Sequence, residues 1–534
     1  MAIALPPPVT PQLAPLQQVV GDSRDMWLID YQGVQIHVVG DLLISVDSVR
    51  AAVTAAPTVS DAVRAVGATF YRAGYPAALL SYAVSGETDL YIRVTVGKLS
   101  EVDAPDSLKS YFSGLVSDHP LRTRSLERAR ALGDTQSERA GENYQPQFRA
   151  LGGDRVALDL GTPAAGNEQL AVAADFNNSG NRYAGPYLVD LSVRQSVASG
   201  DEVVLGGSSD VGIGNGRPYH EGDANWSHIT PFGVFGIEGR YAIFGQDVQG
   251  IRLEGHFSSG AATFLTPLYA DLNDRAVLQL KVERSDESVQ AHVLNATPTP
   301  TLSLSLEKLL EILGLAAPPL TQAQVLSELY NSAEIDLSGV SRIDFGTQEL
   351  EINAALGVRK GLSDRNSAES AASLSYLLLR PSMSLRYSFL PNWDATADVR
   401  AQLGNSVVPQ LEQFVIGGPT SLHAYDTGVG IGDHGEDAHL GIEWHGSDDS
   451  FAARYGLRPR AFVEYGAAKL EHSALDETAG SVKLADVGLS LEAKPIAAIT
   501  TTVSVAQSIY HAGEQTDPPG DSRKYIFFQI TGRY

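Results

Sequence analysis

The sequence predicts a mainly β protein, an antiparallel transmembrane β-barrel preceded by small α/β modules. From about residue 167 onward, apolar and polar side chains alternate along one segment after another. This period of two is typical of barrel strands, which face lipid on one side and a wet lumen on the other. Short turns alternate with long loops rich in Gly and Asp. A last alternating segment, residues 524–534, can pair with the first strand and leave the barrel without a free edge.

The composition excludes several classes of protein. The 534 residues contain no apolar run long enough for a transmembrane helix, which needs roughly 18 residues or more. The 63 Asp and Glu residues outnumber the 39 Lys and Arg residues, for a formal charge of −24. We therefore expect no nucleic-acid partner, since such a protein needs a basic surface to neutralise phosphates. The absence of Cys excludes disulfides, thiolate metal sites and Cys catalysis.

Residues 1–29 are predicted to be a Pro-rich leader or linker. The segment has neither the basic start nor the apolar core of a signal peptide, so an exported chain of this sequence is expected to be the mature form with an added Met. It also lacks the pattern of a strong helix.

Two small α/β modules are predicted, at residues 30–103 and 104–163. In the first, apolar spacing predicts a β-α-α-β-β order, and Thr58 and Asp61 cap the second helix. The expected elements are strands at 35–39, 79–84 and 89–96 and helices at 48–56 and 58–73. In the second module we expect helices near 108–115 and 126–132 and a strand at 155–160.

The barrel prediction covers residues 164–534. The clearest strands are residues 382–389 and 393–404, joined by the tight turn Pro391-Asn392. A soluble β-sandwich would alternate as well. Charges recur on the polar face of strand after strand, which favours a wet lumen and therefore a membrane barrel. In the closing strand, Phe528 and Tyr534 lie on the apolar face, and a terminal aromatic residue suits the membrane interface.

One segment resembles a known family. Residues 413–425 read QFVIGGPTSLHAY, which is similar to an inward-folding loop of the TpsB transporters of two-partner secretion, the haemolysin-activator branch of the outer-membrane assembly superfamily. The residues that carry the resemblance are Gly417, Gly418, Ser421, Leu422 and Tyr425. The resemblance runs from about residue 30 to the end, and the Asn- and Gly-rich segment 174–185 is similar to the family's first barrel hairpin.

This resemblance implies two POTRA modules, a sixteen-stranded barrel and a loop at 413–438 that folds back into the lumen. The family has Arg-Gly where this chain has His423 and Ala424. Its Arg pairs with an Asp in an aromatic-x-Asp-x-Gly strand motif, which Phe462, Glu464 and Gly466 match with Glu for Asp. His is shorter than Arg and Glu is longer than Asp, so the two groups can still come into contact. His cannot, however, form the bidentate hydrogen bonds of Arg. We therefore predict that His423 contacts Glu464 and anchors the loop. The alternative is that His423 only lines a wet lumen.

The function implied by the resemblance is export of a partner exoprotein, of adhesin, cytolysin or toxin type, through a barrel in the cell outer membrane. Periplasmic modules would first capture an unfolded segment on a sheet edge, and by analogy residues 89–96 and 58–73 are candidate groove walls. The implied partners are the exoprotein, outer-membrane lipid and the barrel-assembly machinery. The sequence predicts no enzyme activity, catalytic residue or cofactor. An assembly factor that inserts β-barrels and a passive porin are the alternatives.

Two further segments are ambiguous. Residues 296–335 look like an insertion with two Leu-rich helical patterns, at 302–315 and 320–329, expected in the fourth outer loop. It either caps the pore or touches the substrate, or it is a tolerated insertion. His434, Glu436, Asp437 and His439 are spaced closely enough to bind a metal. The general acidity of the loop explains them more simply, so we predict no metal site.

Overall fold

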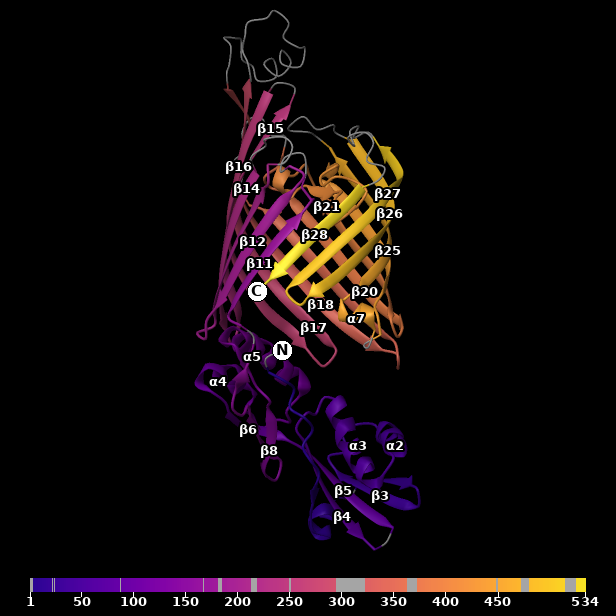
Figure 1. Cartoon of the computed structure of the whole chain (residues 1–534). Coiled ribbons are helices and arrows are strands. Elements are labelled where there is room, and N and C mark those ends of the chain that lie inside the picture. The colour runs from indigo at the N-terminus through magenta and orange to yellow at the C-terminus, as the bar shows by residue number, and fades with distance from the viewer. Residues whose placement is uncertain are drawn as a thin grey trace, which may run out of the picture.

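The computed structural model describes residues 3–21, 23, 25–86, 88–166, 168–180, 185–212, 219–248, 251–293, 322–362, 372–447, 450–471, 480–513 and 525–534. Two α/β modules lie below one end of a large β-barrel (Figure 1). We call this end of the barrel the module side and the opposite end the far side. No helix among these residues has the length and apolar character needed to cross a membrane.

The first module is a five-stranded sheet with two helices on one face. Its strand order is β1-β4-β5-β3-β2. Thr58 accepts the backbone N–H of Asp61 and so caps the second helix, as its sequence predicts. Val49, Val53, Val66 and Phe70 are buried on the sheet because they share the inner stripes of the two helices. The elements are β1 (Gln12–Leu13), α1 (Leu16–Val20), β2 (Met26–Tyr31), β3 (Val34–Gly40), α2 (Val46–Thr54), α3 (Val59–Arg72), β4 (Ala78–Ser85) and β5 (Asp89–Val96).

Two expectations for this module are wrong. The segment 1–29 is not a plain extended linker, because its described residues supply β1, α1 and the start of β2. Residues 89–96 do not form a groove wall at a sheet edge. They form β5, an internal strand that pairs with β4 along its whole length and with β3 from Asp89 to Val94. The edge strands are β1 and β2.

The second module packs α4 and α5 on the sheet β6-β9-β8. The expected boundary between residues 103 and 104 is displaced, since residues 98–103 form β6 and pair in parallel with β9 of this second sheet. The helix expected at 126–132 is also longer than its apolar pattern, because polar and charged residues extend it. The elements are β6 (Lys98–Asp103), α4 (Asp106–Phe112), η1 (Ser113–Leu115), α5 (Thr123–Ala140), β7 (Glu142–Asn143), β8 (Gln147–Gly152), β9 (Arg155–Asp159) and β10 (Ala164–Ala165).

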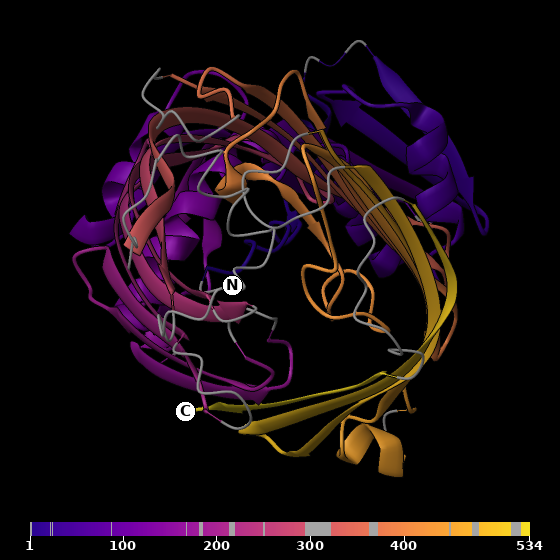
Figure 2. The same cartoon turned by 90° about the horizontal axis from the view of Figure 1, so that it is seen from above.

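In the described part of the chain, sixteen antiparallel strands close into one barrel (Figure 2). Each strand pairs with its neighbour in sequence, and β28 closes the ring on β11 through residues 529–533. The strands are β11 (Leu170–Asn177), β12 (Leu188–Ser196), β13 (Asp201–Asp210), β14 (Tyr219–Thr230), β15 (Gly233–Val248), β16 (Ile251–Ala270), β17 (Asp274–Val293), β18 (Gln322–Asp344), β19 (Glu349–Gly361), β20 (Leu377–Leu390), β21 (Trp393–Gly404), β24 (His434–Trp444), β25 (Arg458–Leu470), β26 (Gly480–Ile496), β27 (Ile499–Gly513) and β28 (Tyr525–Arg533).

The outer face of the barrel is apolar. Large side chains exposed there include Leu191, Leu205, Ile237, Val282, Leu337, Leu440, Leu489 and Ile526. Soluble monomers rarely expose so large a continuous apolar surface, whereas a membrane barrel requires one. The inner face carries buried charged groups such as Arg359, Asp437 and Asp486. The alternation that the sequence predicts is therefore apolar outside and polar inside.

The insertion expected at 296–335 is only partly described. Residues 294–321, including the helical pattern at 302–315, lie outside the described residues. They connect β17 to β18, which is the fourth connection on the far side. The second helical pattern, at 320–329, is wrong from residue 322 onward, because that stretch begins β18 and pairs with β17. Long-range pairing in the barrel overrides the local helical period of these Leu residues.

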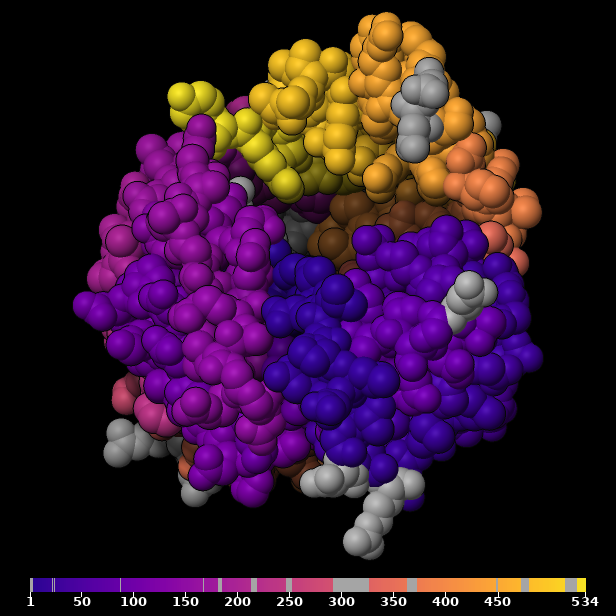
Figure 3. All heavy atoms as spheres, turned by 90° about the horizontal axis from the view of Figure 1, so that it is seen from below, coloured from indigo at the N-terminus to yellow at the C-terminus, as the bar shows by residue number. Residues whose placement is uncertain are grey.

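The second module is fixed to the barrel by buried polar contacts. The guanidinium of Arg139, at the end of α5, donates to the carbonyl oxygen of Gly200 at 2.6 Å and to Oγ of Ser227 at 2.8 Å. Gln136 donates to the carbonyl oxygen of Ala198 at 2.7 Å. These acceptors lie at the module-side ends of β12–β14 or in their turns. Seen from the module side, the two modules cover part of the barrel mouth and leave a hollow beside the C-terminal strands (Figure 3).

Candidate functional site

The candidate site is a loop that leaves the barrel wall after β21 and runs inside the lumen before it returns as β24 (Figure 2). We call residues 405–433 the inward loop. It contains the short helix η2 (Gln410–Glu412) and the paired strands β22 (Phe414–Ile416) and β23 (Gly430–Gly432). The expected end at residue 438 is too late, because residues 434–438 already belong to the wall strand β24.

Two glycines make the turn that follows β22. Gly417 and Gly418 have φ angles of 98° and 78°, a region that side chains with a Cβ rarely adopt. A Cβ on Gly417 would lie 2.2 Å from the carbonyl oxygen of Asp426. The backbone N–H of Gly418 donates to the carbonyl oxygen of Tyr425 at 2.8 Å and closes the loop on itself. The Gly-Gly pair of the sequence motif is therefore required by the geometry of this turn.

The apolar side of the loop lies on the inner faces of β25, β26 and β27. Ile416, Leu422 and Ala424 are fully buried. They form one cluster with Phe414, Tyr425, Val429, Phe462, Ala468, Val482, Leu484 and Ala506. Gly466 on β25 leaves room for Leu422, since a Cβ there would lie 2.6 Å from the Leu422 side chain. Phe462 and Gly466 of the predicted wall motif thus form the surface against which the loop tip packs.

Glu464, between these two residues on β25, binds the loop tip. One carboxylate oxygen accepts the backbone N–H of His423 at 2.9 Å, and the other lies 2.9 Å from Nδ1 of the same residue. The predicted contact between His423 and Glu464 is therefore present. His439 on β24 lies alongside, with its Nδ1 2.9 Å from Glu464. The carboxylate is 2% exposed, so these contacts satisfy a charge that the barrel interior would otherwise leave unpaired.

Three more contacts fix the tip. Asp486 on β26 accepts the backbone N–H of Ala424 at 2.7 Å. The hydroxyl of Tyr425 donates to the carbonyl oxygen of Tyr510 on β27 at 2.9 Å. Ser421 donates to Asp437 at 3.0 Å, and Asp437 is held in turn by Arg400 at 2.6 Å. Every residue from 421 to 425 thus contacts the wall or the apolar cluster.

The root of the loop has an anchor that the sequence motif does not contain. Glu412, at the end of η2, lies 2.6 Å from the guanidinium of Arg359 and 2.9 Å from that of Arg380. Its carboxylate also accepts the hydroxyl of Tyr330 at 3.1 Å. These partners come from β18, β19 and β20, a part of the wall that β21 and β24 separate from the tip anchor on β25 to β27. Arg359 is also paired with Glu283 and Glu334, so Glu412 belongs to a buried ion-pair network.

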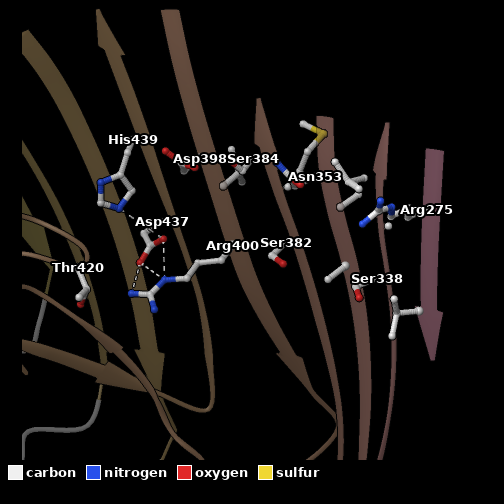
Figure 4. Close-up of a pocket in the computed structure, with 17 residues that line it drawn as sticks. Arg275, Ser338, Asn353, Ser382, Ser384, Asp398, Arg400, Thr420, Asp437 and His439 are labelled. Atoms are coloured by element: carbon white, nitrogen blue, oxygen red, sulfur yellow. Dashed lines mark hydrogen bonds and ion pairs between the residues drawn. The ribbon is translucent and has the colours of Figure 1, made fainter. Parts of the chain in front are cut away.

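The loop tip lies between two cavities, each lined in part by polar and charged side chains. One, of about 510 Å³, lies against the wall from β17 to β21 and is lined by Ser338, Asn353, Ser382 and Ser384 with charged groups around them (Figure 4). The other, of about 370 Å³, lies against β25 to β28 and the start of the barrel. Thr420 lines both cavities. A loop in this place obstructs the lumen between these two cavities.

The four closely spaced residues considered above as metal ligands lie as follows. Asp437 is paired with Arg400, His439 contacts Glu464, and Nε2 of His434 lies 4.0 Å from Glu471. Glu436 is exposed. Within the described ranges, no group of three or more His, Asp or Glu residues could hold a metal ion.

The closing strand residues lie at the seam of the barrel. The ring of Phe528 is 5.4 Å from that of Phe176 on β11, a contact between the last strand and the first. Tyr534 follows β28 and exchanges two backbone hydrogen bonds with Val172, at 2.7 and 2.8 Å, while its side chain is exposed. The seam is therefore joined by both apolar contacts and ladder hydrogen bonds.

Comparison with solved structures shows the fold. CdiB from Escherichia coli matches with a TM-score of 0.63 over 96% of this chain and 92% of its own, at 13% identity. The chain has the fold of CdiB. CdiB from Acinetobacter baumannii matches with a TM-score of 0.60 at 13% identity, over 99% of this chain and 95% of its own. BamA from Haemophilus ducreyi, solved without its POTRA domains 1–3, gives a TM-score of 0.50 at 12% identity, over 95% and 100%. No family model matches the chain, and no curated protein matches it in sequence.

Proposed function

We propose that this protein is an outer-membrane transporter that exports a partner exoprotein through its barrel, with its N-terminal modules in the periplasm. The observation that carries the proposal is the inward loop, held in a polar lumen by hydrogen bonds at its tip and by ion pairs at its root. The loop motif that resembles TpsB transporters and the fold shared with CdiB support the proposal separately. A passive porin would gain nothing from so extensive an anchoring of an obstruction.

The chemistry of the lumen suits an unfolded chain. Hydroxyl, amide and balanced charged groups line the larger cavity, among them Ser382, Ser384, Asp398 and Arg400. Such a surface can exchange hydrogen bonds with a moving backbone without binding it in one register. Export then requires the tip to leave the β25 wall so that the two cavities join. The root anchor at Glu412 would hold the loop on β18 to β20 while the tip moves.

A cross-linking experiment tests the path. The chain has no Cys, so a single introduced Cys is a unique probe. Ser384 lines the inner cavity, and its neighbour Leu385 lines an outer apolar groove. We expect a candidate exoprotein, encoded by a neighbouring gene and stalled by a folded C-terminal fusion, to cross-link to Ser384→Cys but not to Leu385→Cys. Equal cross-linking at both positions, or secretion that does not depend on this protein, contradicts the proposal.

The alternative function, insertion of other β-barrels, is supported by the fold shared with BamA at a TM-score of 0.50. It predicts a different outcome. Depletion of an assembly factor lowers the amounts of many outer-membrane proteins, whereas depletion of an exporter lowers only the secretion of its partner. Quantitative proteomics of the outer membrane after depletion separates the two.

A further inference from the structure

The leader of the chain covers one edge of the first module. Gln12 and Leu13 form β1 and pair in parallel with Ser81 and Tyr82 of β4. The backbone N–H of Ala14 adds a hydrogen bond to the carbonyl oxygen of Tyr82 at 2.9 Å. β4 is 8 residues long and β1 only 2, so most of the edge of β4 has no partner strand on that side among the described residues.

The pairing of β1 cannot be extended in either direction. Pro11 precedes it and Pro15 follows Ala14. Proline has no backbone N–H and cannot donate to a strand ladder. The side chain of Leu13 is 71% exposed and gains little from burial. A few backbone hydrogen bonds therefore hold β1, and a strand with uninterrupted N–H groups can make more of them with the same edge.

The leader is fixed on both sides of β1 by contacts other than the β1–β4 ladder, and on the C-terminal side α1 packs against both β4 and β5. On one side, Ile3 is 1% exposed in the core of the second module, and its carbonyl oxygen accepts from Arg130 at 2.7 Å. On the other side, Val19 of α1 is fully buried, and Arg93 donates to its carbonyl oxygen at 2.7 Å. β1 can leave the edge while both flanks stay in place. Such a tether keeps the strand at high local concentration, so it returns when the edge is free.

We propose that residues 11–15 are a placeholder strand that covers the β4 edge until an extended segment of the exported chain displaces it. This inference rests on the export function proposed above. The displacing segment is a Pro-free stretch of polypeptide that can pair along up to the full length of β4, adding main-chain hydrogen bonds with little demand on its sequence. Its side chains would also cover Val84, which is 63% exposed near the end of β4.

The placeholder strand protects the β4 edge from unwanted pairing. An open edge pairs with any extended chain and promotes aggregation. A strand limited by flanking prolines covers the edge, but a longer segment forms more backbone hydrogen bonds and displaces it. The module can thereby reject short or interrupted segments and accept long ones. The selectivity comes from the length of uninterrupted backbone rather than from side-chain pockets.

A binding experiment on the full chain in detergent tests the inference. The probe is a fluorescent peptide that copies residues 9–20 with Pro11→Thr and Pro15→Thr, and the readout is fluorescence anisotropy. Ala14→Pro in the protein removes the donor to Tyr82, whereas the control Ala14→Gly keeps it. We expect Ala14→Pro to tighten probe binding about three- to ten-fold relative to the wild type and to Ala14→Gly, as expected for one lost competing hydrogen bond.

A reversible disulfide between β1 and β4, called the staple below, gives a second test that does not depend on the folding of the Ala14→Pro variant. Leu13→Cys with Tyr82→Cys places two Cys residues at paired positions in an otherwise Cys-free chain. We expect the oxidised staple to abolish probe binding and reductant to restore it in the same sample. Probe binding that is unchanged by the staple, or absent from every variant, overturns the inference. Neither result alters the cross-linking expected at Ser384→Cys, so failure here is distinct from failure of the export proposal.

Discussion

Glu464 on the barrel wall accepts the backbone N–H of His423 and lies 2.9 Å from its ring nitrogen. The backbone contact requires only that a carboxylate reach this point of the loop. The ring contact depends on the identity of residue 423. Loop position is therefore coupled to one carboxylate through two different donors, and this coupling can be tested by changing either partner.

Shortening the carboxylate should release the loop tip, and lengthening its partner should restore it. Glu464→Asp shortens the carboxylate side chain by one methylene group. His423→Arg introduces a longer cation whose guanidinium can donate two hydrogen bonds to the carboxylate. As a reporter, Ala424→Cys places a thiol at a fully buried position of the tip. We expect Glu464→Asp to speed maleimide labelling about ten-fold, since a hydrogen bond to a charged group contributes about 1.5–3 kcal/mol. The double variant with His423→Arg should return the rate toward that of the parent.

The matched control for this series is Glu436→Asp, because Glu436 is exposed on the neighbouring strand β24. It should leave the labelling rate of the reporter unchanged. Equal labelling rates in Glu464→Asp and in the double variant would show that the two residues do not act as a pair.

Removing the charge at the loop root should lower the free energy of unfolding of the whole barrel. Glu412→Gln takes a 4% exposed carboxylate from between Arg359 and Arg380. Breaking a buried ion pair by removing one partner typically costs about 3–5 kcal/mol. We expect a loss of free energy of unfolding near the lower end, since Arg359 keeps Glu283 and Glu334. Urea unfolding measured by intrinsic fluorescence checks this, and the exposed Glu436→Gln should have no effect.

A methyl group at the loop turn should displace the tip. Gly417→Ala introduces a Cβ 2.2 Å from a backbone oxygen, at a φ of 98°. Residues forced into such a conformation cost about 1–3 kcal/mol. We expect labelling of the Ala424→Cys reporter to rise about ten-fold, with little change in overall unfolding. Gly222→Ala is the control, because the nearest atom to its Cβ lies at 4.0 Å. A Gly417→Ala variant with an unchanged labelling rate would contradict this assignment of the turn.

Loss of Arg139 should loosen the second module from the barrel. The side chain donates to Gly200 and Ser227 across the joint and is 8% exposed. Arg139→Ala removes these buried hydrogen bonds and the ion pair with Glu202, at about 1–3 kcal/mol, although the Gly200 carbonyl oxygen keeps the backbone N–H of Ile229. We expect amide hydrogen exchange at the end of α5 to accelerate about ten-fold or more. Arg128→Ala removes an exposed guanidinium from the same helix and should not change exchange. Equal exchange in the two variants would show that the joint does not depend on Arg139.

Much of the candidate site could be predicted from a short stretch of sequence. Residues 417–425 and 462–466 are contiguous motifs, and their contact follows once both face one lumen. The root anchor could not be found in this way. Glu412 meets Arg359 and Arg380 from positions 53 and 32 residues away in the chain. Only the register of β18, β19 and β20 decides that these side chains converge, and no local pattern encodes that register.

The sequence by itself determined the alternating strands, because a period of two is a local property that each strand carries in its own residues, and the charges that recur on the polar face favoured a barrel over a sandwich. It likewise determined α2 and α3 of the first module, through apolar spacing and the cap at Thr58. The tertiary structure decided which strands are edges and what covers them. It buried β5 in the middle of its sheet, moved β6 to the second module and brought the leader against β4. Strand order depends on the pairing of distant segments, which the composition and period of one segment do not specify.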